Sequence, residues 1–131
     1  MQIRHMITKS QISLKRQQAC KLYNQLLSKV DQIITPKSDF KEVTPFLYYI
    51  RVPANHRQPL RDYLQKDGID TGIHWQPGHW FSLLKDARKD DMVVTDKIGN
   101  EILSLPLNSK ITENQISFIC SSINTYFNLI I

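Results

Sequence analysis

The sequence predicts a single domain of α/β (α+β) class, a two-layer sandwich in which helices pack on a small and partly antiparallel sheet. Two observations predict this class. Apolar residues recur at helical spacing near both ends of the chain, and short β-rich segments lie between them. The composition agrees, because 131 residues with 41% hydrophobic and 22% charged side chains suit a globular domain rather than a disordered or coiled-coil chain. We expect one domain over 1–131, with a basic amphipathic helix in 1–30 and an α/β body in 46–127.

The first helix is expected from about residue 11 to residue 30. Its apolar residues follow steps of three, four and seven, and polar residues fill the opposite face. The apolar positions are Ile12, Ala19, Leu22, Tyr23, Leu26, Leu27 and Val30. Residues 31–45 contain two prolines among mixed charges, so we expect a loop there.

A strand and a second helix are expected after this loop. Residues 46–52 are rich in β-forming residues and apolar on both faces, which predicts a strand covered on both sides. Either Asn55 or His56 can cap the following helix, which is expected to run to Asp67. Gly68 then occupies the position where a residue with positive φ is favoured at a helix end.

The segment 69–75 is expected to form a strand with one buried face, because larger side chains alternate there with small or polar ones. A Pro-Gly turn with aromatic and histidine neighbours follows in residues 76–81. The buried face of the strand would comprise Ile69, Thr71, Ile73 and Trp75, and the opposite face ends in His74.

A short helix, a strand and a long helix are expected in the last part of the chain. Thr95 can cap a helix that runs to Glu101, and residues 102–105 are expected to form a strand that ends at a proline. Thr112 and Gln115 have the spacing of a capping box, which marks the start of the last helix. Its apolar stripe is formed by Ile116, Ile119, Cys120, Ile123 and Phe127.

The net charge of +5 is concentrated at one end of the chain. Residues 1–30 carry +6 and no acidic side chain, whereas residues 31–131 carry −1. A basic segment can form a solvated helix face, pack against an acidic neighbour or bind phosphates. No base-stacking or groove-reading motif accompanies the charge, so nucleic acid is the weakest of these alternatives.

The cysteine pattern and the lack of long apolar runs indicate the cellular compartment of the protein. Cys20 and Cys120 lie in helix-like contexts, and we expect reduced thiols in a cytoplasmic protein, although the sequence also allows a disulfide. No apolar run approaches the ~20 residues of a membrane span, and the first residues lack the apolar stretch of a signal peptide. We therefore expect no membrane partner.

The densest cluster of polar and aromatic residues lies between His74 and Trp80. It contains both tryptophans and two of the four histidines of the chain. Tryptophan packs on flat rings, and histidine exchanges protons near neutral pH. Three hypotheses are open: tryptophans that close the edge of the core, a metal site using His74 and His79 without an evident third ligand, and a substrate-binding loop. No phosphate loop, dinucleotide fingerprint or hydrolase elbow competes with this cluster.

Several motifs occur in a recognisable order. They are Tyr23-Asn-Gln-Leu-Leu27 after a basic helix, Thr71-Gly-Ile-His-Trp-Gln-Pro-Gly-His79, Glu101-Ile-Leu-Ser-Leu-Pro-Leu107, and Thr112-Glu-Asn-Gln115. The strand 46–52 is also followed by an Arg-x-x-Leu helix that begins at Arg57. Together these motifs resemble the C-terminal part of the DegT/DnrJ/EryC1/StrS sugar aminotransferases. The resemblance runs from about residue 10 to residue 127.

This resemblance implies the small domain of a fold-type-I pyridoxal-phosphate (PLP) enzyme. Such enzymes move an amino group onto a keto group of a nucleotide-linked sugar, in the synthesis of lipopolysaccharide O-antigen, other surface polysaccharides or antibiotic sugars. Their active site forms between two subunits, and the C-terminal domain closes over it. The resemblance further implies that His74, Trp75, His79 and Trp80 are substrate-binding residues, the histidines as polar contacts and Trp75 as a wall.

The departures from the family pattern limit what this chain can do alone. The family's cofactor lysine and its other PLP-binding residues belong to an N-terminal domain that these residues do not match, so we expect no catalytic residue, bound PLP or metal in this chain. Gly78 replaces a bulky apolar residue, and Trp80-Phe-Ser replaces a polar-Pro-aromatic stretch, which leaves the substrate open. The expected partner is the PLP domain or a second subunit. The alternatives are a non-catalytic assembly module that pairs with a separate N-terminal half, and a basic-arm nucleic-acid binder.

Overall fold

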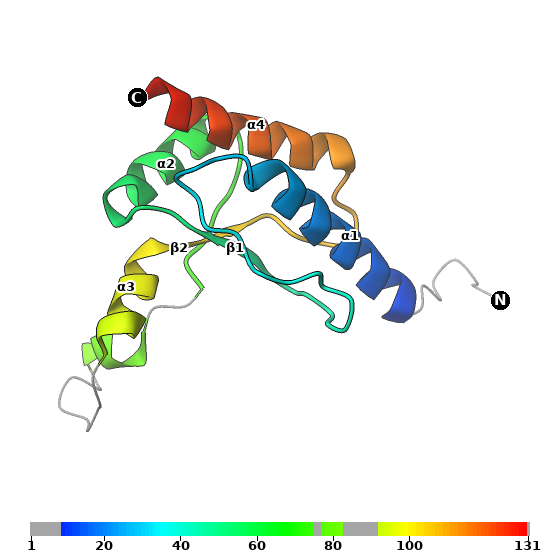
Figure 1. Cartoon of the computed structure of the whole chain (residues 1–131), viewed down its shortest axis with the longest axis horizontal. Helices are drawn as coiled ribbons and strands as arrows, with labels where there is room; N and C mark the ends of the chain where they lie inside the picture. Colours follow the sequence, from blue (N-terminus) through cyan, green and yellow to red (C-terminus); the bar gives the residue numbers. More distant parts are fainter. Residues whose placement is uncertain (1–8, 75–76, 83–91, 131) are drawn as a thin grey trace.

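The computed structural model describes residues 9–74, 77–82 and 92–130, and in these residues it confirms the predicted fold class. Three long helices lie together on one side of a two-stranded antiparallel sheet, and a shorter helix lies at one end of the sheet (Figure 1). The elements in chain order are α1 (Lys9–Leu27), β1 (Tyr48–Arg51), α2 (Ala54–Lys66), the 3-10 helix η2 (Gly78–Trp80), α3 (Val93–Glu101), β2 (Ile102–Leu105) and α4 (Glu113–Leu129).

The core lies between the sheet and the three long helices. β1 pairs with β2 so that Tyr48 is opposite Leu105 and Ile50 is opposite Leu103, and all four side chains are buried. The ring of Tyr23 on α1 stacks on Tyr48, with 4.5 Å between the ring centroids. The helices contribute Cys20 and Leu27 from α1, Leu60 and Leu64 from α2, and Ile116, Ile119, Cys120, Ile123 and Phe127 from α4. The predicted apolar stripe of the last helix is therefore confirmed.

The second face of β1 is not covered as expected by the described residues. Tyr49, which points to that face, is 42% exposed, and Phe46 just before the strand is also exposed. The strand is shorter than predicted as well, because its ladder with β2 begins only at Tyr48. Among the described residues, this face is therefore exposed at Tyr49 of β1, whereas its partner Ser104 on β2 is buried.

Two helices begin earlier than the sequence indicated. The carbonyl of Pro53 accepts the N–H of His56, so Asn55 and His56 lie inside the first turn of α2 and neither caps it. The carbonyl of Met92 accepts the first helical bond of α3, which places Thr95 inside that helix. The predicted side-chain caps at these three positions were wrong because a backbone carbonyl further upstream opens each helix.

Two other helix-end predictions are confirmed. Gly68 follows α2 with a φ of 78°, the left-handed conformation that favours glycine. At the start of α4, the Thr112 hydroxyl accepts the N–H of Gln115 at 3.1 Å. The Gln115 side chain in turn accepts the N–H of Thr112 at 2.9 Å, which completes the capping box.

The segment predicted as a third strand over 69–75 forms a single bridge. Gly72 alone pairs with Ser104 of β2. In this antiparallel register the next paired positions on β2 would be Pro106 and Ile102. Pro106 has no N–H to donate, and the Ile102 carbonyl accepts a bond from an arginine of α2 instead. The ladder therefore ends on both sides of Gly72, and Trp75 lies outside the described residues.

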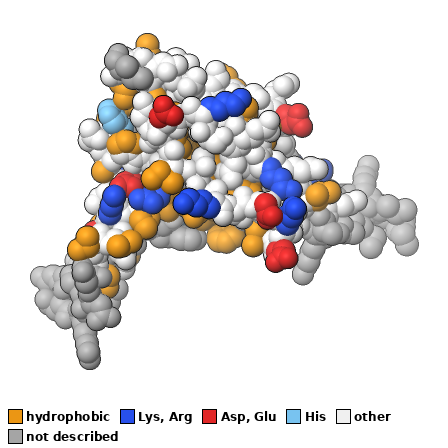
Figure 2. Space-filling model, viewed as in Figure 1, with side chains coloured by type: hydrophobic (Ala, Val, Ile, Leu, Met, Phe, Trp, Pro, Cys, Tyr) orange, Lys and Arg blue, Asp and Glu red, His pale blue; other side chains and the backbone are white. Residues whose placement is uncertain are grey.

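In the described residues both cysteine thiols are buried, and basic and acidic side chains are mixed on one face of the surface (Figure 2). Cys20 and Cys120 are free and buried, and burial raises the pKa of each thiol to about 12. Lys and Arg side chains are interspersed with Asp and Glu side chains on the face that Figure 2 shows. None of the described helices is both long and apolar enough to cross a membrane.

Candidate functional site

The described part of the His74–Trp80 cluster begins at the edge of β2, where Gly72 holds the chain to the sheet. The N–H of Gly72 donates to the Ser104 carbonyl at 3.1 Å, and the N–H of Ser104 donates back at 2.7 Å. The imidazole of His74 lies directly over Gly72, because a Cβ placed on this glycine would be only 2.5 Å from the ring carbon Cε1 of His74. Any larger residue at position 72 would displace the half-buried His74 ring.

The same segment is tied to α2 through an arginine. Arg61 donates from Nε to the Thr71 hydroxyl at 3.0 Å and from Nη2 to the Thr71 carbonyl at 3.4 Å. These bonds fix the backbone immediately before Gly72. The His74 side chain is therefore positioned by the sheet on one side and by α2 on the other.

The Pro-Gly turn of residues 77–82 is anchored by a tryptophan. Pro77 is buried, and its carbonyl accepts the N–H of Trp80 at 3.0 Å, which forms the short η2 helix. The indole Nε1–H of Trp80 donates to Oδ1 of Asp96 on α3 at 2.6 Å. A bond to an ionised carboxylate is stronger than one between neutral groups, so Asp96 fixes the tryptophan ring.

Helix α3 packs closely under this turn at Gly99. A Cβ on Gly99 would lie 2.7 Å from Cγ of Pro77 and 3.0 Å from Cη2 of Trp80. Arg57 of α2 donates from Nη1 to the Gly99 carbonyl at 2.5 Å and to the Ile102 carbonyl at 3.3 Å. Burial, with a smaller contribution from the neighbouring Arg61 charge, lowers the pKa of Arg57. Helix α3 is therefore the platform on which the turn rests.

The structure describes the predicted site residues only in part. His74 and Trp80 are both half-buried, and both rest on the continuous α3–β2 unit, His74 through Gly72 and Trp80 through Asp96. His79 lies within η2, but its side chain is outside the described part, as is all of Trp75.

Sequence reasoning missed the residues that position this cluster, namely Arg57, Arg61, Asp96 and Gly99. One signal was present, because a glycine inside a helix costs about 0.5–1 kcal/mol relative to alanine and so indicates a close approach of another segment. Asp96 and the two arginines carried no comparable signal, since charged residues on helices are ordinarily solvated.

The side chains that the structure describes do not form a site for a metal ion or a PLP group. Within the described ranges, no three His, Cys, Asp or Glu side chains are grouped closely enough to hold a metal. A cofactor lysine must be enclosed with groups that hold the pyridine ring and phosphate. The lysine side chains that the structure describes are all exposed, at positions 15, 21, 29, 37, 41, 66, 97 and 110.

The family model of the DegT/DnrJ/EryC1/StrS aminotransferases matches residues 1–124. The chain belongs to this family. Solved structures share its fold: the aminotransferase TlmJ from Streptoalloteichus hindustanus has a TM-score of 0.80 at 19% identity over 99% of this chain and 35% of its own. Helicobacter pylori PseC, an aminotransferase involved in pseudoaminic acid biosynthesis, has a TM-score of 0.76 at 17% identity over 90% of this chain and 33% of its own.

A third similar structure was solved with its cofactor. NtdA from Bacillus subtilis, with bound PMP, has a TM-score of 0.73 at 21% identity over 87% of this chain and 28% of its own. The chain thus spans about a third of the length of these solved proteins. No curated protein sequence matches the chain. The identities are low, so the structural similarity establishes the shared fold.

Proposed function

We propose that this chain is the substrate-bordering small domain of a PLP-dependent aminotransferase that acts on nucleotide-linked keto sugars. The observation that carries the proposal is the family match over residues 1–124. Two proteins of similar structure support a sugar substrate and a PLP-derived cofactor, because one acts in pseudoaminic acid biosynthesis and the other was solved with bound PMP. In this proposal His74, Trp75, His79 and Trp80 border the substrate, and amino transfer needs a polypeptide that supplies the cofactor lysine.

The geometry supports different tasks for His74 and Trp80. The His74 ring is held against Gly72 and can donate or accept one hydrogen bond to a sugar hydroxyl or a phosphate oxygen. Trp80 already donates its indole N–H to Asp96, so it would contribute the flat side of its ring as a wall. Groups that are already positioned in this way orient a substrate without a further loss of side-chain entropy on binding.

The cofactor part of the proposal is tested by adding PLP to the 131-residue chain. We expect no internal-aldimine absorbance band and no lysine that is modified at one position after borohydride reduction. A band that borohydride fixes to one mapped lysine would overturn this part of the proposal, because it would place a cofactor lysine within the chain.

The substrate part is tested by mixing the chain with a PLP-binding N-terminal domain of a family member. Restored amino transfer to a nucleotide-linked keto sugar is expected, and His74→Ala should lower kcat/KM by about tenfold, the loss of one hydrogen bond. His56→Ala is the matched control, since His56 contacts Tyr126 on α4 instead. Equal activity of both variants would refute the assignment of His74.

A second candidate function is a non-catalytic assembly module that pairs with a separate N-terminal half. A groove of about 590 Å³ between α1 and the start of α4 favours it, because three lysines, Lys15, Lys21 and Lys110, are among its described lining residues, and Glu113 is the one acidic residue among them. Such a surface suits an acidic partner segment. Under this hypothesis Lys15→Glu with Lys21→Glu should abolish pairing with the N-terminal half, whereas Lys37→Glu should not.

The basic-arm alternative gives a different result in the same system. Salt-dependent binding to nucleic acid that survives His74→Ala but is lost in the Lys15→Glu, Lys21→Glu variant would favour it. Pairing with the N-terminal half that remains in this double variant would count against the assembly module.

A further inference from the structure

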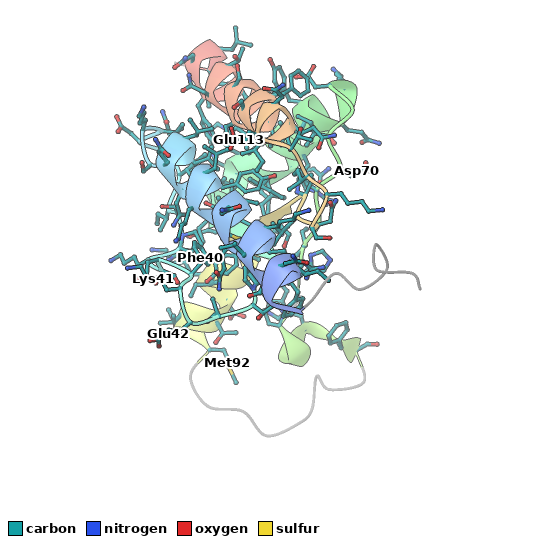
Figure 3. The ribbon with its side chains drawn as sticks, turned by 90° about the vertical axis from the view of Figure 1, so that its right-hand side faces the viewer. Phe40, Lys41, Glu42, Asp70, Met92 and Glu113 are labelled. Atoms are coloured by element: carbon teal, nitrogen blue, oxygen red, sulfur yellow. The ribbon has the colours of Figure 1, made fainter. Side chains whose placement is uncertain are left out.

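We propose that a second cavity, which we name the Asp70 pocket, binds an amino sugar. It has a volume of about 480 Å³ and lies between the turn after α2, the loop 106–111 and the first turns of α4. This volume is in the range of small-molecule sites. Neither His74 nor the turn 77–82 is among its lining residues. In Figure 3, Asp70 lies beside the loop that leads into α4 at Glu113.

One side of the Asp70 pocket is an aromatic and aliphatic wall. Phe118 lines the pocket from α4, and its ring is 53% exposed although the neighbouring Ile119 is buried in the core. Ile69 and Ile111 continue the apolar surface. An exposed aromatic ring beside a cavity is suited to the C–H face of a sugar ring, because that face is apolar.

The other side of the pocket carries side-chain amides. Asn108, Asn114 and Gln115 line it, and each amide has both a donor and an acceptor end. The capping box uses the carbonyl oxygen of Gln115, and the Asn108 oxygen accepts the N–H of Lys110 at 2.8 Å. The NH2 ends of these two amides are therefore the parts that can donate to a ligand. Hydroxyl groups are the matching partner, since each can accept and donate at once.

The charge of the pocket selects among polyhydroxylated ligands. Among the lining residues that the structure describes, Asp70 is the only one with an ionisable side chain, so this lining is anionic. A carboxylate repels phosphates and attracts an ammonium group, with which it forms a charge-assisted bond. A nucleotide is therefore a poor match, and a sugar that carries a free amine is a good one.

The relation of this ligand to the amino-transfer reaction rests on the proposed function. Amino transfer to a nucleotide-linked keto sugar yields a nucleotide-linked amino sugar, whose phosphates the Asp70 carboxylate would repel. The matching ligand is therefore an amino sugar from which the nucleotide has been removed. The binding itself does not depend on the proposed function, because it needs only the residues of this chain.

The test is a titration of the isotope-labelled 131-residue chain with glucosamine, followed by amide NMR in mildly acidic buffer where the amine is protonated. We expect a Kd in the millimolar range, the affinity that about twelve ligand atoms provide. Shifts should concentrate on Asn108, Gln115 and Phe118. Glucose should bind about three- to tenfold more weakly, because it lacks the ammonium group.

Two variants separate the contributions. Asp70→Asn should reduce glucosamine binding to the level of glucose, while the matched control Asp31→Asn, an exposed carboxylate elsewhere, should leave binding unchanged. Phe118→Ala should weaken both sugars and keep the fold, since its ring is half exposed. Absence of shifts, shifts at His74 and Trp80 instead, or equal binding of both sugars by the unaltered chain would overturn the proposal. None of these results requires the PLP-binding domain, so the proposed function stands or fails separately.

Discussion

Replacement of Gly99 by alanine separates two opposite physical effects. Helix propensity alone predicts stabilisation, because Gly→Ala inside a helix gains about 0.5–1 kcal/mol. The structure predicts the reverse, because the added Cβ would lie 2.7 Å from the Pro77 ring and 3.0 Å from Trp80. Pro77 is a buried rigid ring and Trp80 is held by Asp96, so neither can move aside cheaply.

The expected net effect follows from the sizes of these terms. Overpacking a well-packed contact costs typically about 1–3 kcal/mol, which exceeds the helix gain. We therefore expect Gly99→Ala to lower the free energy of unfolding by about 1 kcal/mol, or the Tm by roughly 4 °C. The displaced turn should also change the fluorescence of Trp80, which can be followed alone in a Trp75→Phe background.

Chemical denaturation of the variant and of a matched control measures the effect. Val94→Ala on the same helix is the control, because Val94 is 69% exposed and the change should be neutral or slightly stabilising. A Gly99→Ala protein that is more stable than the parent, with unchanged Trp80 fluorescence, would refute the close approach of α3 to the turn.

Three further predictions concern the anchor of the turn, a helix cap and the thiols. Asp96→Ala should destabilise the protein by about 1–2 kcal/mol and expose Trp80 to quenchers, with Asp96→Asn intermediate, and equal quenching of all three would contradict the bond. Thr112→Ala should cost about 1 kcal/mol in denaturation, and a loss below a few tenths would mean that the capping box contributes little. Burial raises the pKa of Cys20 and of Cys120 to about 12. The folded state therefore keeps its thiol protons where the unfolded state loses them. Stability should be complete below about pH 8.5 and should fall towards pH 12, by up to about 1.4 kcal/mol per unit for each thiol. A double Cys→Ala variant should show a shallower pH slope, and an unchanged slope would exclude the thiols as its cause.

The sequence was sufficient to predict the elements that have a regular apolar pattern or a local motif. The apolar stripe of α4 and its capping box, the positive φ of Gly68 and the strand over 102–105 all follow from local patterns, and the structure confirms them. The helix starts at Pro53 and Met92 were missed, because a backbone carbonyl opens each helix and leaves no side-chain signature. The prediction of a strand over 69–75 was wrong for a non-local reason, because the neighbouring strand β2 pairs with this segment at a single position.

In the candidate site as well, the sequence predicts the cluster itself but not the contacts that position it. The cluster from His74 to Trp80 was evident from its composition, because rare aromatic and histidine residues are concentrated there. The contacts that position it come from Arg57, Asp96 and Gly99, which are distant in sequence from the cluster. Only the helical glycine hinted at such a contact. Tertiary hydrogen bonds between a loop and a helix have no local period, so one sequence cannot reveal them.

The pairing of β1 with β2 has a consequence for how the segment that we propose borders the substrate can vary in length. Arg51 pairs with Ile102, so residues 52–101, including α2, the turn 77–82 and α3, form one excursion between two adjacent strands. The entropy of closing such a long excursion grows only logarithmically, and doubling its length costs only about 0.6 kcal/mol. Insertions at exposed positions of this excursion that make no packing contact therefore add little closing entropy to the pairing of β1 with β2.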